Sequence, residues 1–190
     1  MRSEPLTSRE ELVARLENLR SQNGGSLCIG LDGMDGVGKS TLARELADRL
    51  GGSVISLDDH LTRKQNGYIL HIRGDELKAA ISASRSPMVI EGVCLLGVAH
   101  RCGFDVEVLV YVRRLSRNSG IWHEEELCMA QRPADELKEN ERALRKAFST
   151  TDEPGNIIDD DLGLTGELID YHARWRPVER ADFVFDVSCD

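Results

Sequence analysis

The chain has 190 residues, enough for one domain with a sizeable core and too few for two domains of ordinary size. Its 24 basic and 33 acidic residues give a net charge of −9, which argues against a protein that holds nucleic acid mainly through phosphate contacts. No run of about 18 apolar residues occurs, so we expect no membrane span and no membrane partner. The five cysteines lack tight pairing and favour a cytoplasmic location.

The N-terminal part of the chain, residues 1–24, predicts a helix that runs to about Gln22. Ser8 followed by Glu11 is a capping-box pattern, in which both residues satisfy free backbone N–H groups at a helix start. The apolar residues that follow share one helical face: Leu12, Val13, Leu16 and Leu19. We therefore expect this helix to pack against the rest of the domain along that face.

Five short apolar runs alternate with helical patterns along the rest of the chain. The predicted strands are 26–31, 53–57, 88–93, 106–112 and 182–187, and helical spacing returns at 40–50. This alternation predicts an α/β fold with a five-stranded, mainly parallel sheet and helices on both faces. The charged segment 134–148 predicts another helix, and the turn-rich segment 149–163 predicts a loop. We expect one domain over 1–190, with 113–163 as a lid and mobile segment.

A glycine-rich motif follows the first predicted strand. Gly33, Gly38, Lys39 and Ser40 fit the pattern G-x-x-x-x-G-K-[ST], whose glycines let backbone N–H groups turn toward phosphate oxygens. Lys39 would reach the outer phosphates, and the Ser40 hydroxyl would bind Mg²⁺. The motif predicts a three-layer P-loop NTPase fold and a triphosphate site formed by Gly33, Met34, Asp35, Gly36, Val37, Gly38, Lys39, Ser40 and Thr41.

Carboxylates follow two other predicted strands, where ligands bind in doubly wound sheets. Asp58 could accept the proton of an alcohol or orient it near Mg²⁺, and Asp59 could form the turn. Asp58 also fits a simple turn that ends the strand. Glu91 fits a Mg²⁺ ligand, alone or through water, and equally a structural carboxylate satisfied by backbone donors. The predicted metal ligands are thus Ser40, Asp58 and Glu91.

These motifs resemble the uridine kinase and phosphoribulokinase family of P-loop kinases. The stretches "GLDGMDGVGKSTLARELADRL", "VISLDDH" and "VIEGVCLL" occur in the family's order over about 26–115, and the similarity returns at "DYHARWRPVERADFVF". The resemblance implies that Lys39 and Ser40 bind triphosphate and Mg²⁺, that Asp58 is the base, and that Glu91 is a metal ligand. It further implies an arginine-rich lid in "RRLSR", with Arg113 and Arg117 as catalytic candidates beside Arg114.

The acceptor site departs from the family pattern. His60 and Leu61 stand where the family usually has Phe and Tyr after the aspartates. The candidates for acceptor binding are polar residues of the following segment, each of which is also explained as an ordinary surface residue: Asp59, His60, Tyr68, His71 and Arg73.

The sequence therefore predicts an ATP-dependent phosphotransferase that uses Mg²⁺ and moves the γ-phosphate to a hydroxyl of a small molecule, a nucleoside or a sugar phosphate. ATP is favoured over GTP because no N-K-x-D sequence occurs. The alternative is a regulatory nucleotide-binding P-loop module with little or no kinase activity. A nucleic-acid end kinase is disfavoured by the acidic charge balance, and the sequence predicts no oligomeric state.

Overall fold

Five parallel strands form the centre of the protein in a computed structural model that describes residues 4–62, 66–116, 118–122, 124–129, 131–148 and 162–188. The sheet order is β2-β3-β1-β4-β5, and each neighbouring pair is parallel. The predicted α/β fold is confirmed. The strands are β1 (Cys28–Asp32), β2 (Ser53–Ser56), β3 (Met88–Glu91), β4 (Val108–Leu115) and β5 (Phe183–Ser188).

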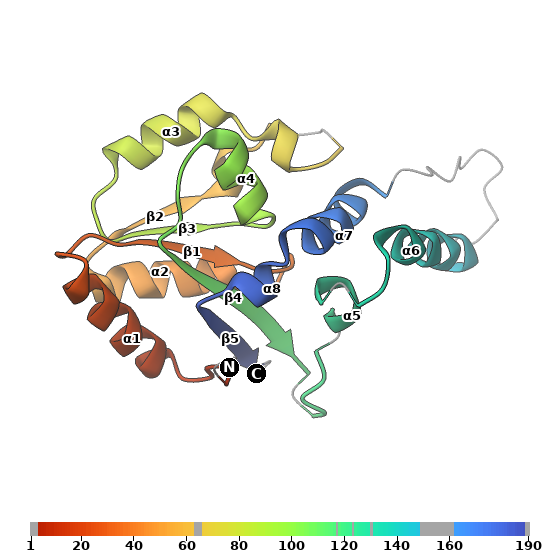
Figure 1. Ribbon diagram of the computed structural model, residues 1–190, viewed down its shortest axis with the longest axis horizontal. Helices are drawn as coiled ribbons and strands as arrows, with labels where there is room; N and C mark the ends of the chain where they lie inside the picture. Colours follow the sequence, from red (N-terminus) through yellow and green to blue (C-terminus); the bar gives the residue numbers. More distant parts are fainter. Residues whose placement is uncertain are drawn as a thin grey trace.

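Helices cover both faces of this sheet (Figure 1). Helices α1 (Arg9–Gln22) and α2 (Lys39–Leu50) lie on one side, and α3 (Gly74–Ala83) and α4 (Leu95–Cys102) lie on the other. The 3₁₀ helices η1 (Leu57–His60) and η2 (Ile69–His71) come between β2 and α3. After β4 the chain continues with α5 (Glu125–Cys128), α6 (Ala134–Phe148) and α7 (Gly163–Trp175), and α8 (Pro177–Arg180) leads into β5.

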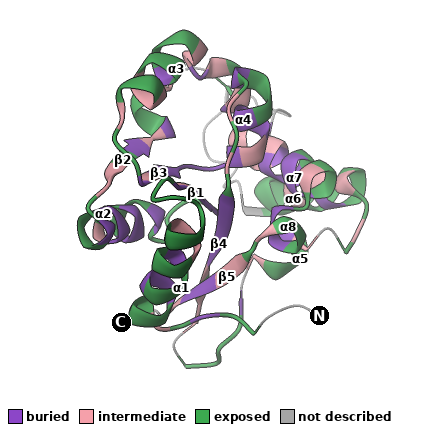
Figure 2. Ribbon diagram, turned by 60° about the vertical axis from the view of Figure 1, so that its left-hand side comes forward, coloured by how far each residue is buried: buried purple, intermediate pink, exposed green. Residues whose placement is uncertain are grey.

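The sheet separates two apolar cores, because side chains alternate between its faces. Ile29, Leu31 and Val110 belong to the core under α1 and α2. Ile90 and Leu109 belong to the core under α3, α4 and α7. Figure 2 shows the result: the central strands are buried, whereas the outer faces of α1 and α3 are exposed.

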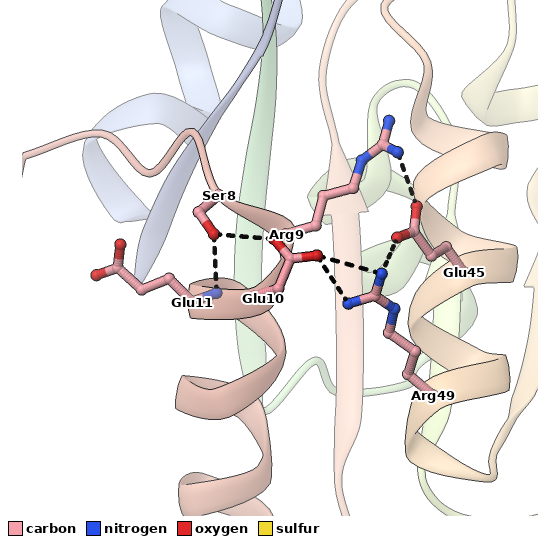
Figure 3. Close-up of polar contacts among 6 residues, drawn as sticks. All are labelled: Ser8, Arg9, Glu10, Glu11, Glu45 and Arg49. Carbon is pink, nitrogen blue, oxygen red and sulfur yellow. Dashed lines mark hydrogen bonds and ion pairs between the residues drawn. The ribbon is translucent and has the colours of Figure 1, made fainter.

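The N-terminus of α1 is capped as the sequence predicts, but with one difference. The Ser8 hydroxyl accepts a hydrogen bond from the Glu11 backbone N–H at 3.2 Å (Figure 3). The Glu11 carboxylate does not complete the reciprocal half of a capping box with Ser8. It accepts from Arg15 at 2.6 Å, one turn along the helix.

Ion pairs fasten α1 to α2. Glu45 of α2 lies between Arg9 at 3.1 Å and Arg49 at 2.8 Å, and Arg49 also reaches Glu10 at 3.4 Å (Figure 3). These side chains are partly or largely exposed, so water and salt screen the pairs and each contributes little to stability. The buried leucines of α1 and α2 therefore supply most of the packing energy between these helices and the sheet.

The N-terminal segment also contacts the edge of the sheet. Leu6 forms an isolated parallel bridge with Phe185 of β5. The Leu6 N–H donates to Val184 O, and the Asp186 N–H donates to Leu6 O, both at 2.8 Å. These two bonds bring the beginning and the end of the described chain side by side.

Most predicted boundaries agree with the structure to within two residues, but one strand end differs by more and one predicted loop falls largely outside the described residues. Strand β4 does not end at 112, because it continues to Leu115 and pairs with β5 along that extension. The predicted loop at 149–163 lies outside the described residues up to 161, and α7 begins at Gly163. Helix α6 has the predicted bounds. Within the described residues, no helix is long and apolar enough to cross a membrane.

Packing of α2 gives a stability prediction. Leu46 is fully buried in the core between α2 and the sheet, so Leu46→Ala should lower the free energy of unfolding by roughly 2–5 kcal/mol. Leu144 of α6 is 53% exposed, and the matched Leu144→Ala should change the free energy of unfolding by about 0.5 kcal/mol or less. Urea denaturation measures both. Equal losses for the two variants would contradict the assigned core.

Candidate active site

The glycine-rich loop lies at the carboxyl edge of the sheet, between the end of β1 at Asp32 and the start of α2 at Lys39. Strand β1 has β3 on one side and β4 on the other, and the chain visits β2 and β3 before it crosses to β4. The loop therefore stands where the direction of strand addition reverses. Crevices at such points are the usual ligand sites of open α/β sheets.

Glycine is required at three positions of the loop by backbone geometry. Gly36 and Gly38 have φ values of 70° and 98°, in the left-handed region that other residues rarely adopt. A Cβ atom on Gly33 would lie 2.4 Å from the Val112 carbonyl oxygen. No side chain caps the N-terminus of α2, so its first N–H groups face the loop without a side-chain partner. This is the arrangement that favours bound phosphate.

Lys39 is folded back into the loop. Its Nζ donates to Gly33 O at 3.1 Å and to Met34 O at 2.6 Å, and the residue is only 6% exposed. Burial lowers the pKa of the ammonium, and the nearby Asp32 and Glu91 carboxylates oppose that shift. The lysine is thus a buried cation held chiefly by carbonyl oxygens, which an anion entering the loop would complement.

A buried carboxylate that sequence reasoning missed supports the loop from below. Asp32 accepts from the Gly33 N–H through Oδ1 at 2.8 Å and from the Tyr171 hydroxyl of α7 through Oδ2. Burial raises the pKa of Asp32 to about 6. Tyr171 also accepts from the Leu96 N–H at 3.2 Å, so one phenol joins the loop, α4 and α7. The only sequence signal was an acidic residue ending an otherwise apolar strand.

Ser40, Ser56 and Glu91 form a second polar cluster beside the loop. Glu91 is 2% exposed, and its Oε1 accepts from the Ser40 hydroxyl at 3.0 Å and from the Ser56 hydroxyl at 2.6 Å. Ser56 is the register partner of Glu91 across β2 and β3. Carboxylate and hydroxyl oxygens are suitable Mg²⁺ ligands. Among the residues that the structure describes, no three His, Cys, Asp or Glu side chains gather as a metal cage.

Asp58 lies on η1, directly after β2, and faces the same cavity as the loop. Its Oδ1 accepts from the Tyr68 hydroxyl at 2.6 Å. The cavity has a volume of about 570 Å³. It is lined by Asp35, Gly36, Gly38, Lys39, Ser40, Thr41, Asp58, Leu61, Tyr68, Glu91, Gly92, Val93 and Leu164.

The cavity lining contains most, but not all, of the predicted triphosphate site. Gly33 and Val37 do not line it: Gly33 packs against Val112, and Val37 is buried in the core under α2. Met34 packs against the apolar cores on both faces of the sheet, and its carbonyl accepts from Lys39. These three residues therefore shape the loop from behind, while its remaining residues face the cavity.

A second cavity of about 400 Å³ adjoins the first at Tyr68, which lines both. Helices α6 and α7 and the segment 66–71 enclose it. Its lining mixes basic, acidic and small residues: Asn66, Gly67, Tyr68, Leu70, His71, Lys138, Arg142, Leu162, Gly163, Gly166, Glu167 and Asp170. This volume falls within the usual range of small-molecule sites.

The predicted acceptor residues divide between these cavities and the supporting loop. Tyr68 and His71 line cavities, whereas Asp59, His60 and Arg73 line neither. The Arg73 guanidinium donates to Leu61 O at 3.0 Å and to Asp59 O at 2.8 Å, and the His60 carbonyl accepts from the Arg73 N–H at 2.8 Å. Arg73 thus holds the turn that carries the aspartates.

The predicted lid arginines are placed differently from one another. Arg113 and Arg114 lie within β4, not after it, and therefore point to opposite faces of the strand. Arg113 makes a bidentate pair with Asp186 at 2.6 and 2.8 Å and stacks over Trp122. Arg114 reaches the Gly36 carbonyl of the glycine-rich loop at 3.3 Å. Arg117 lies outside the described residues.

Comparison with known proteins finds similarity to solved structures, among them two kinases with provisional names. No protein-family profile matches the chain, and no curated protein matches it. A possible uridine kinase from Bacillus stearothermophilus is similar over 93% of this chain and 100% of its own, with 19% identity and a TM-score of 0.46. A protein named provisionally as a fructose transport system kinase from Silicibacter sp. TM1040 is similar over 95% and 99%, with 15% identity and a TM-score of 0.47.

The buried Asp32 generates a pH prediction. Burial raises its folded-state pKa to about 6, against an ordinary value of about 3.9, so the folded protein holds this proton more tightly than the unfolded chain. Relative to Asp32→Asn, the wild type should therefore lose stability as the pH rises from about 4 through 6. The loss is roughly 3 kcal/mol at most, since each pKa unit corresponds to about 1.4 kcal/mol.

Urea denaturation at several pH values measures this difference. Asp48→Asn, a substitution of an exposed aspartate on α2, is the control and should leave the pH dependence of the wild type unchanged. A constant stability difference between wild type and Asp32→Asn from pH 4 to pH 7 would contradict the assigned environment of Asp32.

Proposed function

We propose that the protein is an ATP-dependent phosphotransferase, which moves the γ-phosphoryl group to a hydroxyl of a small molecule. The observation that carries this proposal is one cavity in which the Asp58 carboxylate faces Lys39, Ser40 and the glycine-rich loop. A loop of this kind suits a triphosphate, and a carboxylate opposite it suits an alcohol that must lose a proton.

The loop residues fit the triphosphate. Gly36 and Gly38 have left-handed backbone conformations and open space beside them. A Cβ on Gly36 would meet no atom within 4 Å, and a Cβ on Gly38 would lie 4.0 Å from its nearest neighbour. Phosphate oxygens can therefore approach the backbone closely. Lys39 would exchange its bonds to two loop carbonyls for bonds to the outer phosphates, and the N-terminus of α2 adds its favourable field.

The cluster beside the loop fits Mg²⁺. Ser40 and Glu91 would hold the ion, directly or through water, with the phosphates completing its coordination, because Mg²⁺ commonly binds one or two carboxylates together with substrate phosphates. Asp58, the third predicted metal ligand, lines the same cavity. An ion held there would supply positive charge against the negative charge that develops on the transferred group.

Asp58 is the proposed base. The acceptor oxygen forms a bond to the γ-phosphorus while the bond from that phosphorus to the β–γ bridging oxygen breaks, and ADP leaves. The acceptor proton passes to the Asp58 carboxylate. A base of this kind contributes typically about 10² to 10⁴-fold to the rate.

The second cavity supports an acceptor of small-molecule size. It meets the first cavity at Tyr68, next to Asp58, and its polar lining offers donors and acceptors to a polyhydroxylated compound such as a nucleoside or a sugar phosphate. A polar cavity of this kind favours an enzyme over a regulatory module, for which an open apolar surface would be expected. We place this reaction in the cytoplasm.

Replacement of Lys39 tests the triphosphate site. Lys39→Ala should weaken ATP binding roughly 10- to 100-fold, since a hydrogen bond to a charged group contributes about 1.5–3 kcal/mol, and should abolish transfer. Isothermal titration with MgATP measures the affinity. Lys78→Ala, on the exposed face of α3, should bind as the wild type does. Unchanged affinity in Lys39→Ala would remove the assignment of the loop.

Replacement of Asp58 tests the phosphotransferase activity. ADP formation is measured with MgATP against a panel of nucleosides, sugar phosphates and small hydroxy compounds. Asp58→Asn should leave ATP affinity nearly intact and lower acceptor-dependent turnover by about 10² to 10⁴-fold, because the amide cannot take the proton. It keeps an oxygen for the Tyr68 hydroxyl.

The adjacent Asp59 provides a matched control. Asp59→Asn makes the same chemical change one residue away, outside both cavities, and should keep near wild-type turnover. Greater damage from Asp59→Asn than from Asp58→Asn would reject Asp58 as the base. ATP binding without turnover on any acceptor would instead favour the regulatory module.

A further inference from the structure

The Glu167 carboxylate on α7 accepts two hydrogen bonds from the backbone of a segment that is distant in the sequence. Its Oε2 accepts from the Tyr68 N–H, and its Oε1 accepts from the Ile69 N–H at 3.0 Å. One carboxylate thus receives two consecutive backbone donors at the start of η2. The approach is close, since a Cβ on Gly67 would lie 3.2 Å from Oε2.

The anchored Tyr68 in turn contacts the proposed base. Tyr68 is only 3% exposed, and its hydroxyl donates to Asp58 Oδ1 at 2.6 Å. Burial and the neighbouring Asp58 raise the pKa of the phenol, so it remains protonated and stays a donor. The contacts form one chain: Glu167 fixes the backbone of Tyr68, and Tyr68 fixes one oxygen of Asp58.

The same helix is tied to the glycine-rich loop. Tyr171 lies one turn after Glu167 on α7 and donates to Asp32 at the root of the loop. Residues four apart on a helix lie on the same face. Helix α7 thus contacts both halves of the cavity, the half with the base through Glu167 and the half with the phosphate loop through Tyr171.

We infer that Glu167 is a positioning residue for Asp58, acting through Tyr68, and this inference rests on the proposed function. With Oδ1 held by the Tyr68 hydroxyl, Oδ2 of Asp58 receives the acceptor proton. Tyr68 then serves the base, in addition to lining the acceptor cavity. Loss of Glu167 should let Tyr68 shift and should misplace the base without disturbing the phosphate loop.

The test is a double-mutant cycle with Glu167→Gln, Tyr68→Phe and the double variant. Each single change should lower acceptor-dependent kcat by about 10-fold or more, with ATP affinity within about 2-fold of the wild type. The double variant should be no slower than the worse single variant, because both changes break one chain of contacts. Glu141→Gln, which breaks an ion pair with Arg145 on α6, is the control and should retain wild-type kcat.

Amide hydrogen exchange supplies a readout independent of turnover. Glu167→Gln should accelerate exchange at the Tyr68 and Ile69 amides, because it removes the carboxylate that accepts hydrogen bonds from both N–H groups. Tyr68→Phe keeps the carboxylate and should leave exchange at Ile69 near the wild-type rate.

The outcomes separate this inference from the proposed function. Multiplicative losses of kcat in the double variant, or wild-type exchange at both amides in Glu167→Gln, would overturn the positioning role while leaving the phosphotransferase intact. A lower ATP affinity in Glu167→Gln matching its loss of kcat would also overturn it, because the defect would then lie in the phosphate loop. No turnover by the wild type on any acceptor would overturn the proposed function and the positioning role of Glu167 with it, whatever the exchange rates.

Discussion

The register of the parallel strands is the constraint on which the site depends. Leu31 of β1 pairs with Glu91 of β3, and Glu91 pairs with Ser56 of β2. This register brings the residues that follow each strand to one edge of the sheet, although they are far apart in the sequence. A shift by one residue would turn Glu91 to the opposite face and separate it from Ser40 and Ser56.

This edge of the sheet places one buried cation among several carboxylates. Lys39 is a buried cation among the carboxylates of Asp32, Glu91 and Asp58, which act on its pKa from different strand ends. Carbonyl oxygens and hydroxyls, not a direct ion pair, hold most of these groups in place. The proposed function requires this site to receive a triphosphate and Mg²⁺ together, and the polar groups proposed to hold them are already positioned.

Local signals made much of the fold and the phosphate loop predictable. The loop is one contiguous motif between a strand and a helix, and the strand pattern follows from short apolar runs. The direction of Arg113 was not predictable, because it depends on how far β4 continues and on the partner Asp186, 73 residues later. Glu167 is 99 residues from Tyr68, and nothing in its own surroundings in the sequence marks it. Contacts of this kind arise from tertiary packing alone.

The bridge between Leu6 and Phe185 has a consequence for how the protein behaves among its copies. β5 ends the sheet, and an edge strand with free N–H and C=O groups is a template for pairing with another chain. Leu6 takes up one donor and one acceptor on that edge and covers Phe185, which is 2% exposed. The segment before α1 thereby occupies part of the edge that another chain would need for strand pairing, and two backbone groups of β5 are no longer available to a second copy.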